Sequence, residues 1–387
     1  MKKIIRPSIR TNSKKAHKYK EIYHDLHKII LSGKVLAGDK LPTEAELVEK
    51  YRTSRITVAR ALRDLQAESL IDRRAGSGSY VRRPDNSEPT FGLLIPDLGR
   101  TEIFDPICQG MSRAGQKRSY SLSWGKTLPE VTNQEVGSEE LCHQYIRNRV
   151  SGVFFAPLEL TPAKDAVNRN IVQKLDAAGI PIVLLDRDVE AYPRRSRYDV
   201  IGIDNRRAGY TVTEHLLKLG SRRIGFVGRP SSASTVAARI AGYIEALLAY
   251  GVEVDRSLIR QAEPDDEDAL KRIMETASPE ALVCANDYTA AKVIQGLLRL
   301  GYSIPRDLRI VGIDDVKYAG LLQVPLTTIH QPCHHIGAAA IEAMFDQLAV
   351  PDMPARDILL DFRLVVRESC GSAARNGQNR RAPTEVL

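Results

Sequence analysis

The stretch Leu41-Pro-Thr-Glu-Ala-Glu-Leu47 is followed eight residues later by Arg55-Ile-Thr-Val-Ala-Arg60 and then by Gly76-Ser-Gly-Ser-Tyr80. Thr43 has the chemistry of a helix N-cap, and the glutamate three residues after it completes the spacing of a capping box. Ser54 is predicted to cap a second helix in the same way. Two short strand-like runs surround the Gly-Ser-Gly turn and predict a hairpin. The order is therefore helix, helix and glycine-tipped hairpin.

The second predicted helix has one apolar face and one polar face. Its apolar residues at helical spacing should face the core: Val58, Ala61, Leu62 and Leu65. This leaves Arg55, Thr57 and Arg60 for the outer face, where Arg can bind guanine, Thr can contact bases or phosphates, and a further Arg can hold the backbone. An ordinary solvated face is the alternative. The basic hairpin that follows favours a winged helix-turn-helix that binds DNA.

Charge is unevenly distributed along the 387 residues, which are enough for two or three cores. Residues 1–90 hold 20 Lys and Arg against 11 Asp and Glu, or +9, whereas residues 91–387 hold 36 against 37, or −1. A local basic excess is typical of proteins that contact phosphates, with solubility as the alternative. The charge therefore favours DNA contact by the first quarter of the chain.

Residues 19–83 resemble the DNA-binding domain of the GntR family, whose hallmark is approximately P-S/T-E-x-x-L, S-R-x-T-V-R and G-x-G-T-F/Y-V. Matching positions are Pro42, Thr43, Glu44, Leu47, Ser54, Arg55, Thr57, Val58, Gly76, Gly78, Tyr80 and Val81. Ala59 replaces an arginine that usually approaches DNA, and Ser79 replaces the wing threonine, so the operator sequence is not inherited. We expect Arg60 to supply a phosphate contact instead. The resemblance implies DNA-binding roles for Thr43, Glu44, Ser54, Arg55, Thr57, Arg60, Gly76 and Gly78.

Composition divides the chain further. Residues 1–18 are rich in Lys, Arg, Ser and Asn and are predicted to form a disordered basic arm, before a helix that starts at Tyr19. Residues 84–90 are predicted to be a linker. Residues 91–368 form the second predicted domain, and residues 369–387 a disordered tail.

Apolar runs alternate with helical patterns in the second domain, which predicts an α/β fold with two doubly wound lobes of parallel sheet. Ligands in such folds lie beyond the carboxyl ends of the strands. Asp97, Asp186, Asp287 and Asp314 follow predicted strands, where a carboxylate could accept sugar hydroxyls. Helix capping or a turn is the alternative for each, and is favoured for Asp186 and Asp314. No glycine-rich phosphate loop follows these strands, so no nucleotide cofactor is expected.

Residues 91–368 resemble the effector domain of the LacI/GalR family, which has a periplasmic-binding-protein-like fold. The matching stretches are Arg239-Ile-Ala-Gly-Tyr243, Cys284-Ala-Asn-Asp287, Ile304-Pro-Arg-Asp-Leu-Arg-Ile-Val-Gly-Ile-Asp-Asp315 and Pro325-Leu-Thr-Thr-Ile-His-Gln-Pro332. The resemblance implies that Arg239 and Asp287 contact an effector between the lobes, with Asn286 from the same motif and Phe104 as an aromatic lining. Glu159 is a weaker candidate for the same cleft.

A GntR-type head joined to a LacI-type effector domain resembles the arabinose-repressor type of bacterial regulator, which implies a pentose or related carbohydrate effector. We therefore expect a homodimeric, cytoplasmic DNA-binding regulator, a repressor of carbohydrate-utilisation genes acting on a pseudo-palindromic operator. The alternative is a sugar sensor or solute-binding transport component that does not bind DNA; the start of the sequence has no export signal.

Neither catalysis nor metal binding is expected. The five cysteines are scattered, and Cys333-His-His335 lacks further ligands at metal spacing. The sequence contains no G-x-S-x-G or H-E-x-x-H motif. No 18-residue apolar run is present, so no membrane partner is expected.

Overall fold

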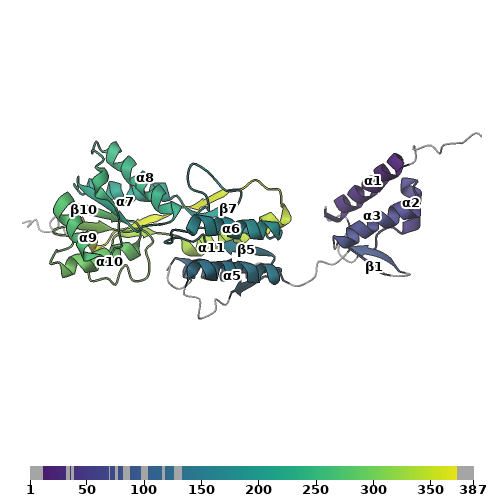
Figure 1. Cartoon of the computed structure of the whole chain (residues 1–387), viewed down its shortest axis with the longest axis horizontal. Helices are drawn as coiled ribbons and strands as arrows, with labels where there is room; N and C mark the ends of the chain where they lie inside the picture. Colours follow the sequence, from purple (N-terminus) through teal and green to yellow (C-terminus); the bar gives the residue numbers. More distant parts are fainter. Residues whose placement is uncertain are drawn as a thin grey trace, which may run out of the picture. The chain divides into compact units, whose positions relative to one another are not determined.

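The computed structural model describes residues 12–31, 35, 39–68, 70–74, 77–81, 88–96, 103–115, 118–125 and 133–372 (Figure 1). The chain divides into two compact units, residues 1–88 and 89–387. No helix within the described ranges has the length and apolar character needed to cross a membrane.

The first unit consists of three helices and a hairpin. These are α1 (Asn12–Leu31), α2 (Glu44–Tyr51), α3 (Arg55–Ala67), β1 (Ile71–Arg74) and β2 (Gly78–Val81). The two strands are antiparallel, with Ile71 opposite Val81. One buried cluster joins all five elements, with contributions from Ile22, Leu26, Leu47, Val58, Leu62, Ile71 and Val81. The predicted order of two helices and a basic hairpin is therefore present, with α1 packed against α3.

Two predicted boundaries need correction. Helix α1 begins at Asn12, so residues 12–18 are not part of a disordered arm, because this Lys- and Ala-containing run favours helix and continues directly into the apolar pattern. The predicted tail begins later than residue 369, because Glu368–Cys370 form a short 3₁₀ helix. The Ser369 hydroxyl donates to the Ile310 carbonyl at 2.6 Å and anchors this helix to a buried strand. Residues 1–11, 84–87 and 373–387 lie outside the described residues.

The first lobe of the second unit is a six-stranded parallel sheet in the order β13-β7-β6-β5-β3-β4. The strands are β3 (Thr90–Leu94), β4 (Ser121–Trp124), β5 (Gly152–Phe155), β6 (Ile182–Leu185), β7 (Asp199–Ile203) and β13 (Asp357–Leu360). Successive strand residues alternate between two cores, with Phe154 in one and Phe155 in the other. The helices that supply these cores are α4 (Phe104–Ala114) with α11 (Cys333–Ala349), and α5 (Gln134–Arg147) with α6 (Lys164–Ala177).

The second lobe has a parallel sheet in the order β11-β10-β8-β9. The strands are β8 (Ile224–Gly228), β9 (Ile259–Gln261), β10 (Ala281–Cys284) and β11 (Arg309–Val311). Its cores are formed with α7 (Asn205–Lys218) and α8 (Ser234–Ala249), and with α9 (Glu267–Arg272) and α10 (Asp287–Arg299). Helices α7 and α8 approach closely at Gly209, where a Cβ atom would collide with the Arg239 carbonyl. This contact fixes the backbone of Arg239.

The chain crosses between the lobes after β7, before α11 and after β13. A short antiparallel ribbon of β12 (Thr328–His330) and β14 (Arg363–Val365) accompanies the later crossings. Both sheets are parallel and carry helices on both faces (Figure 1). The predicted α/β architecture, a helical head with a hairpin followed by two doubly wound lobes, is confirmed.

Candidate ligand cleft and nucleic-acid interface

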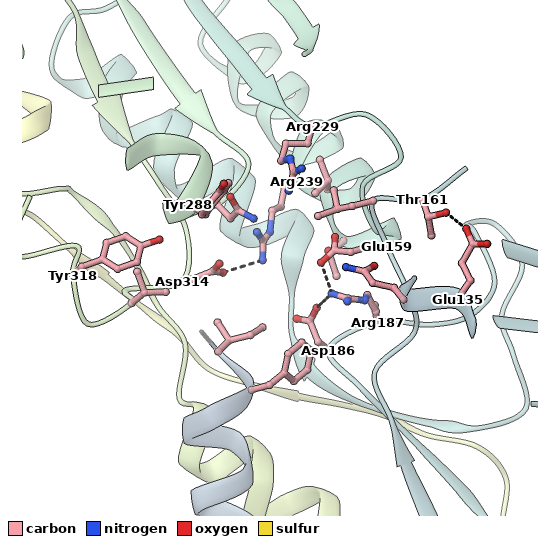
Figure 2. Close-up of a pocket in the computed structure, with 18 of the residues that line it drawn as sticks. Glu135, Glu159, Thr161, Asp186, Arg187, Arg229, Arg239, Tyr288, Asp314 and Tyr318 are labelled. Atoms are coloured by element: carbon pink, nitrogen blue, oxygen red, sulfur yellow. Dashed lines mark hydrogen bonds and ion pairs between the residues drawn. The ribbon is translucent and has the colours of Figure 1, made fainter. Parts of the chain in front are cut away.

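A cavity of about 820 Å³ lies between the two lobes of the second unit. Its size is within the range of small-molecule sites, roughly 300–1,000 Å³. Both lobes supply polar and aromatic side chains to its lining (Figure 2). Its lining includes Phe104, Glu159, Asp186, Arg187, Arg239, Asn286 and Asp314. The site thus lies beyond the carboxyl ends of strands, as the fold rule requires.

Arg239 projects from α8 into this cavity and is only 4% exposed. Its Nε donates to Asn205 Oδ1 at 2.8 Å and its Nη1 donates to the Ala285 carbonyl at 2.5 Å. Its Nη2 reaches Asp314 Oδ1 at 3.4 Å. Three partners from three segments therefore hold the guanidinium in one orientation at the cavity wall.

Asp186 and Asp314 face each other across the cleft from the ends of strands in different lobes (Figure 2). Both have left-handed backbones, with φ of 69° and 136°. Such conformations cost roughly 1–3 kcal/mol each for a side-chain-bearing residue and cluster at functional sites. Burial raises the pKa of both carboxyls, while Arg187 opposes this at Asp186 and Arg239 opposes it at Asp314. Asp186 and Asp314 can therefore have the turn role expected from the sequence and also line the cleft.

Arg187 is a cleft residue that the sequence reasoning missed. Its Nε donates to the Pro157 carbonyl at 2.7 Å, and its Nη1 contacts both Asp186 Oδ2 at 3.1 Å and Glu159 Oε1 at 3.2 Å. Its guanidinium carbon lies 5.7 Å from the centre of the Phe104 ring. The sequence signal that could have identified Arg187 is the charged pair Asp186-Arg187, which directly follows the fully apolar strand β6.

Glu159 connects the two lobes. Besides Arg187, it accepts a hydrogen bond at Oε2 from the Ala233 backbone N–H at 3.2 Å. Ala233 is the N-cap of α8, and its backbone N–H is one of the donors at the helix start that have no partner within the helix, so Glu159 satisfies this donor from the other lobe. The adjacent Leu160 N–H donates to the Ser231 carbonyl at 2.7 Å. These contacts hold the lobes together at one edge of the cavity.

The structure does not place Asp287 in the cavity, which corrects the expectation. Asp287 is fully buried; its Oδ1 accepts from the Thr328 hydroxyl at 2.6 Å and its Oδ2 from the Val316 N–H at 3.1 Å. Asn286 instead lines the cleft, as N-cap of α10, and its Oδ1 accepts from the Thr289 N–H at 2.9 Å. Adjacent residues at a helix start point in different directions, so only one of this pair can face the ligand space. Asp97 lies outside the described residues.

Three further lining residues were not singled out from the sequence. They are Arg229, directly after β8, and the aromatic residues Tyr288 and Tyr318. Arg229 lies 5.7 Å from the Tyr288 ring centre and its Nε donates to Glu263 at 3.0 Å. The strand-end rule could have identified Arg229, whereas the position of Tyr318 depends on the path of a long loop.

In the first unit, the start of α3 is organised by Ser54. The Ser54 side chain accepts from the Thr57 N–H at 3.4 Å, and the two hydroxyl oxygens are 2.9 Å apart. Thr57 is only 7% exposed, so its predicted position on the outer face is wrong: the cap draws its hydroxyl inward. Arg55 is exposed beside it. The outer face therefore begins with Arg55 and the neighbouring Ile56.

Three of the other predicted DNA-binding residues have structural partners. Thr43 forms the predicted capping box with Glu46, and Glu44 pairs with Arg73 of the hairpin. The Arg60 guanidinium carbon lies 4.6 Å from the centre of the Tyr19 ring of α1, and Arg60 is exposed. Gly78 has a φ of 122°, which glycine adopts without strain. Gly76 lies outside the described residues.

Comparison with known proteins matches the two units separately. Residues 18–81 match the gntR family of bacterial regulatory proteins, and residues 213–370 match the periplasmic binding protein-like domain. The protein is therefore a ligand-responsive DNA-binding transcriptional regulator that joins a GntR-type head to a periplasmic-binding-protein-like domain.

Curated relatives extend over almost the whole chain. The arabinose metabolism transcriptional repressor of Geobacillus stearothermophilus is 28% identical, over 91% of this chain and 97% of that protein. Its counterpart in Halalkalibacterium halodurans is 27% identical, over 92% and 97%. The solved complex of the transcriptional regulator CelR with cellobiose is 24% identical, covers 81% of this chain and 90% of that one, and has a TM-score of 0.63. This last likeness supports the fold.

Proposed function

We propose that this protein represses carbohydrate-utilisation genes, and that an uncharged sugar bound in the cleft changes its affinity for DNA. The observation that carries the proposal is the pairing of charges in the cavity. Arg239 is paired with Asp314, and Arg187 with both Asp186 and Glu159. The two buried guanidinium groups are therefore already occupied by carboxylates of the protein.

This pairing favours a ligand that donates hydrogen bonds and carries no negative charge. Asp186 Oδ1 is buried at the cavity and has no hydrogen-bond partner among the described residues. A sugar hydroxyl would satisfy this acceptor, whereas a phosphate would repel it and would need unpaired cations. Phe104 and Tyr288 line the cavity and supply aromatic surface for the apolar side of a sugar. The relatives that repress arabinose metabolism support a pentose as the first ligand to test.

Operator binding by a homodimer follows from the type of head. A helix-turn-helix unit gains affinity and register when two copies bind paired half-sites. The sugar changes occupancy only through different affinities for the DNA-competent and incompetent states, a coupling of typically about 1–3 kcal/mol. We assign the regulator to the bacterial cytoplasm, where its operator is accessible.

A thermal-shift series on the full-length protein tests the ligand class. Neutral pentoses and hexoses, L-arabinose first, are compared with the phosphate esters of the same sugars. We expect a neutral sugar to raise the melting temperature and to change the retention of an operator duplex in a gel shift, while its phosphate does neither. Asp186→Asn is the matched variant, because it keeps size and removes the acceptor charge. Tighter binding of a phosphate ester than of its parent sugar would contradict the proposal.

A further inference from the structure

Ile56 is a large apolar side chain that the DNA-binding unit leaves in solvent. It is 79% exposed, and no other large hydrophobic residue of this unit is exposed among those whose side-chain burial the structure describes. Val58, Ala61, Leu62 and Leu65 of the same helix instead pack in the core. A single exposed apolar residue is common on protein surfaces, so its position must show whether it has a partner.

The position of Ile56 is the second residue of α3, next to the exposed Arg55. In helix-turn-helix proteins the N-terminal residues of the recognition helix contact the base edges. Ala59 lies one turn further along the same helical face and is half-buried. At the N-terminal end of α3, the side chains of Ile56 and Ala59 therefore form adjacent apolar surface.

Two arginines further along the same helix contact other groups of the protein. Arg60 stacks against Tyr19 of α1, and Arg63 Nε donates to the Ala59 carbonyl at 3.4 Å. Arg60 and Arg63 follow Ile56 by four and seven residues, so they lie further along the same helical face, where basic side chains suit contacts with phosphates. Residues 1–90 carry the +9 charge that attracts the DNA backbone, with 20 basic and 11 acidic side chains. Basic side chains are therefore available for the phosphate contacts. The apolar side chain of Ile56 cannot bind a phosphate.

We propose that Ile56 contacts the C5 methyl group of a thymine in the major groove, and so specifies a T·A base pair in each half-site. The thymine methyl is the apolar feature of the major groove, and cytosine lacks it. Ala59 leaves room for the base edge and cannot bind guanine itself. The inference rests on the proposed binding of operator DNA. It goes further by naming the base that Ile56 selects.

The test uses duplexes that the full-length protein enriches from a randomised library. Each thymidine in the best duplex is replaced singly by deoxyuridine, which removes one methyl group and keeps every hydrogen-bonding group. Affinity is measured by fluorescence anisotropy at a fixed salt concentration. We expect one symmetry-related position in each half-site at which binding weakens about fourfold, the value for one buried methyl group. In Ile56→Ala the same replacement should have no effect.

Leu321→Ala is the matched control, because Leu321 is an equally exposed apolar residue, at 85%, in the other unit. It should keep the full response to deoxyuridine. Ile56→Ala should melt at the wild-type temperature, since its side chain supports no core. The inference is overturned if no thymine position responds in the wild-type protein, or if the response persists in Ile56→Ala. If the protein enriches no duplex at all, the proposed operator binding itself fails.

Discussion

The DNA-binding unit and the ligand cleft present their functional side chains in opposite ways. On α3, Arg55 and Ile56 are exposed, and the core beneath does not depend on them. In the cleft, Arg239 is 4% exposed and takes part in bonds that join three segments of the second lobe. A substitution on α3 should therefore change binding alone, whereas a substitution in the cleft should change binding and stability together.

Arg239→Ala should give the largest effect. It leaves the Asp314 carboxylate, whose side chain is largely buried with 13% exposed, without its cation, and breaking a buried pair typically costs about 3–5 kcal/mol. We expect this loss in the free energy of unfolding, measured by denaturant titration, together with loss of the DNA response to sugar. Arg206→Ala is the control, because Arg206 forms an exposed pair with Glu245 on the neighbouring helices. Equal free energies of unfolding for Arg239→Ala and Arg206→Ala would contradict the proposed dependence of stability on the cleft residue.

Arg55→Ala should affect only DNA binding. Loss of a bidentate contact to guanine typically costs about 1–3 kcal/mol, or roughly five- to 150-fold in affinity. We expect this weakening in a gel shift, with an unchanged melting temperature and unchanged affinity for a neutral sugar. Arg52→Ala, in the turn before α3, is the matched control for loss of one exposed positive charge. Retention of wild-type DNA affinity by Arg55→Ala would remove Arg55 from the readout.

Asp287→Ala separates support of the cleft from contact with the ligand. It removes the acceptor of the Thr328 hydroxyl and the Val316 N–H, and leaving such buried groups unsatisfied typically costs about 1–3 kcal/mol. We expect lower stability of the second unit by denaturant titration. Asn286→Ala should instead give the larger loss of sugar affinity in calorimetry, because Asn286 lines the cavity. A reversed order of sugar affinities would restore Asp287 as the ligand contact.

Much of this architecture could be predicted because its signals are local. The Thr43 capping box, the apolar face of α3 and the buried strands each depend on a few neighbouring residues. The strand-end rule also identified Asp186 and Asp314 as candidates. It could not tell that Asn286 rather than Asp287 faces the cavity, because this depends on Thr328, which arrives from a distant segment. The bridge from Glu159 to α8 is likewise a contact between lobes, which spacing cannot reveal.

Thr43→Ala should give the smallest effect and would sharpen the contrast within the first unit. The Thr43 hydroxyl accepts from the Glu46 N–H at 3.3 Å, and loss of such an N-cap typically costs about 1 kcal/mol. For a unit of this size we expect its melting transition to fall by roughly 4–8 °C. Thr43→Ser keeps the accepting oxygen and should melt near the wild-type temperature. If Thr43 acts mainly as a cap, DNA affinity measured well below the transition should change little in both variants. A large loss of affinity in Thr43→Ala without a shift in melting would instead show direct contact with DNA, and α2 would then belong with Arg55 among the exposed binding groups.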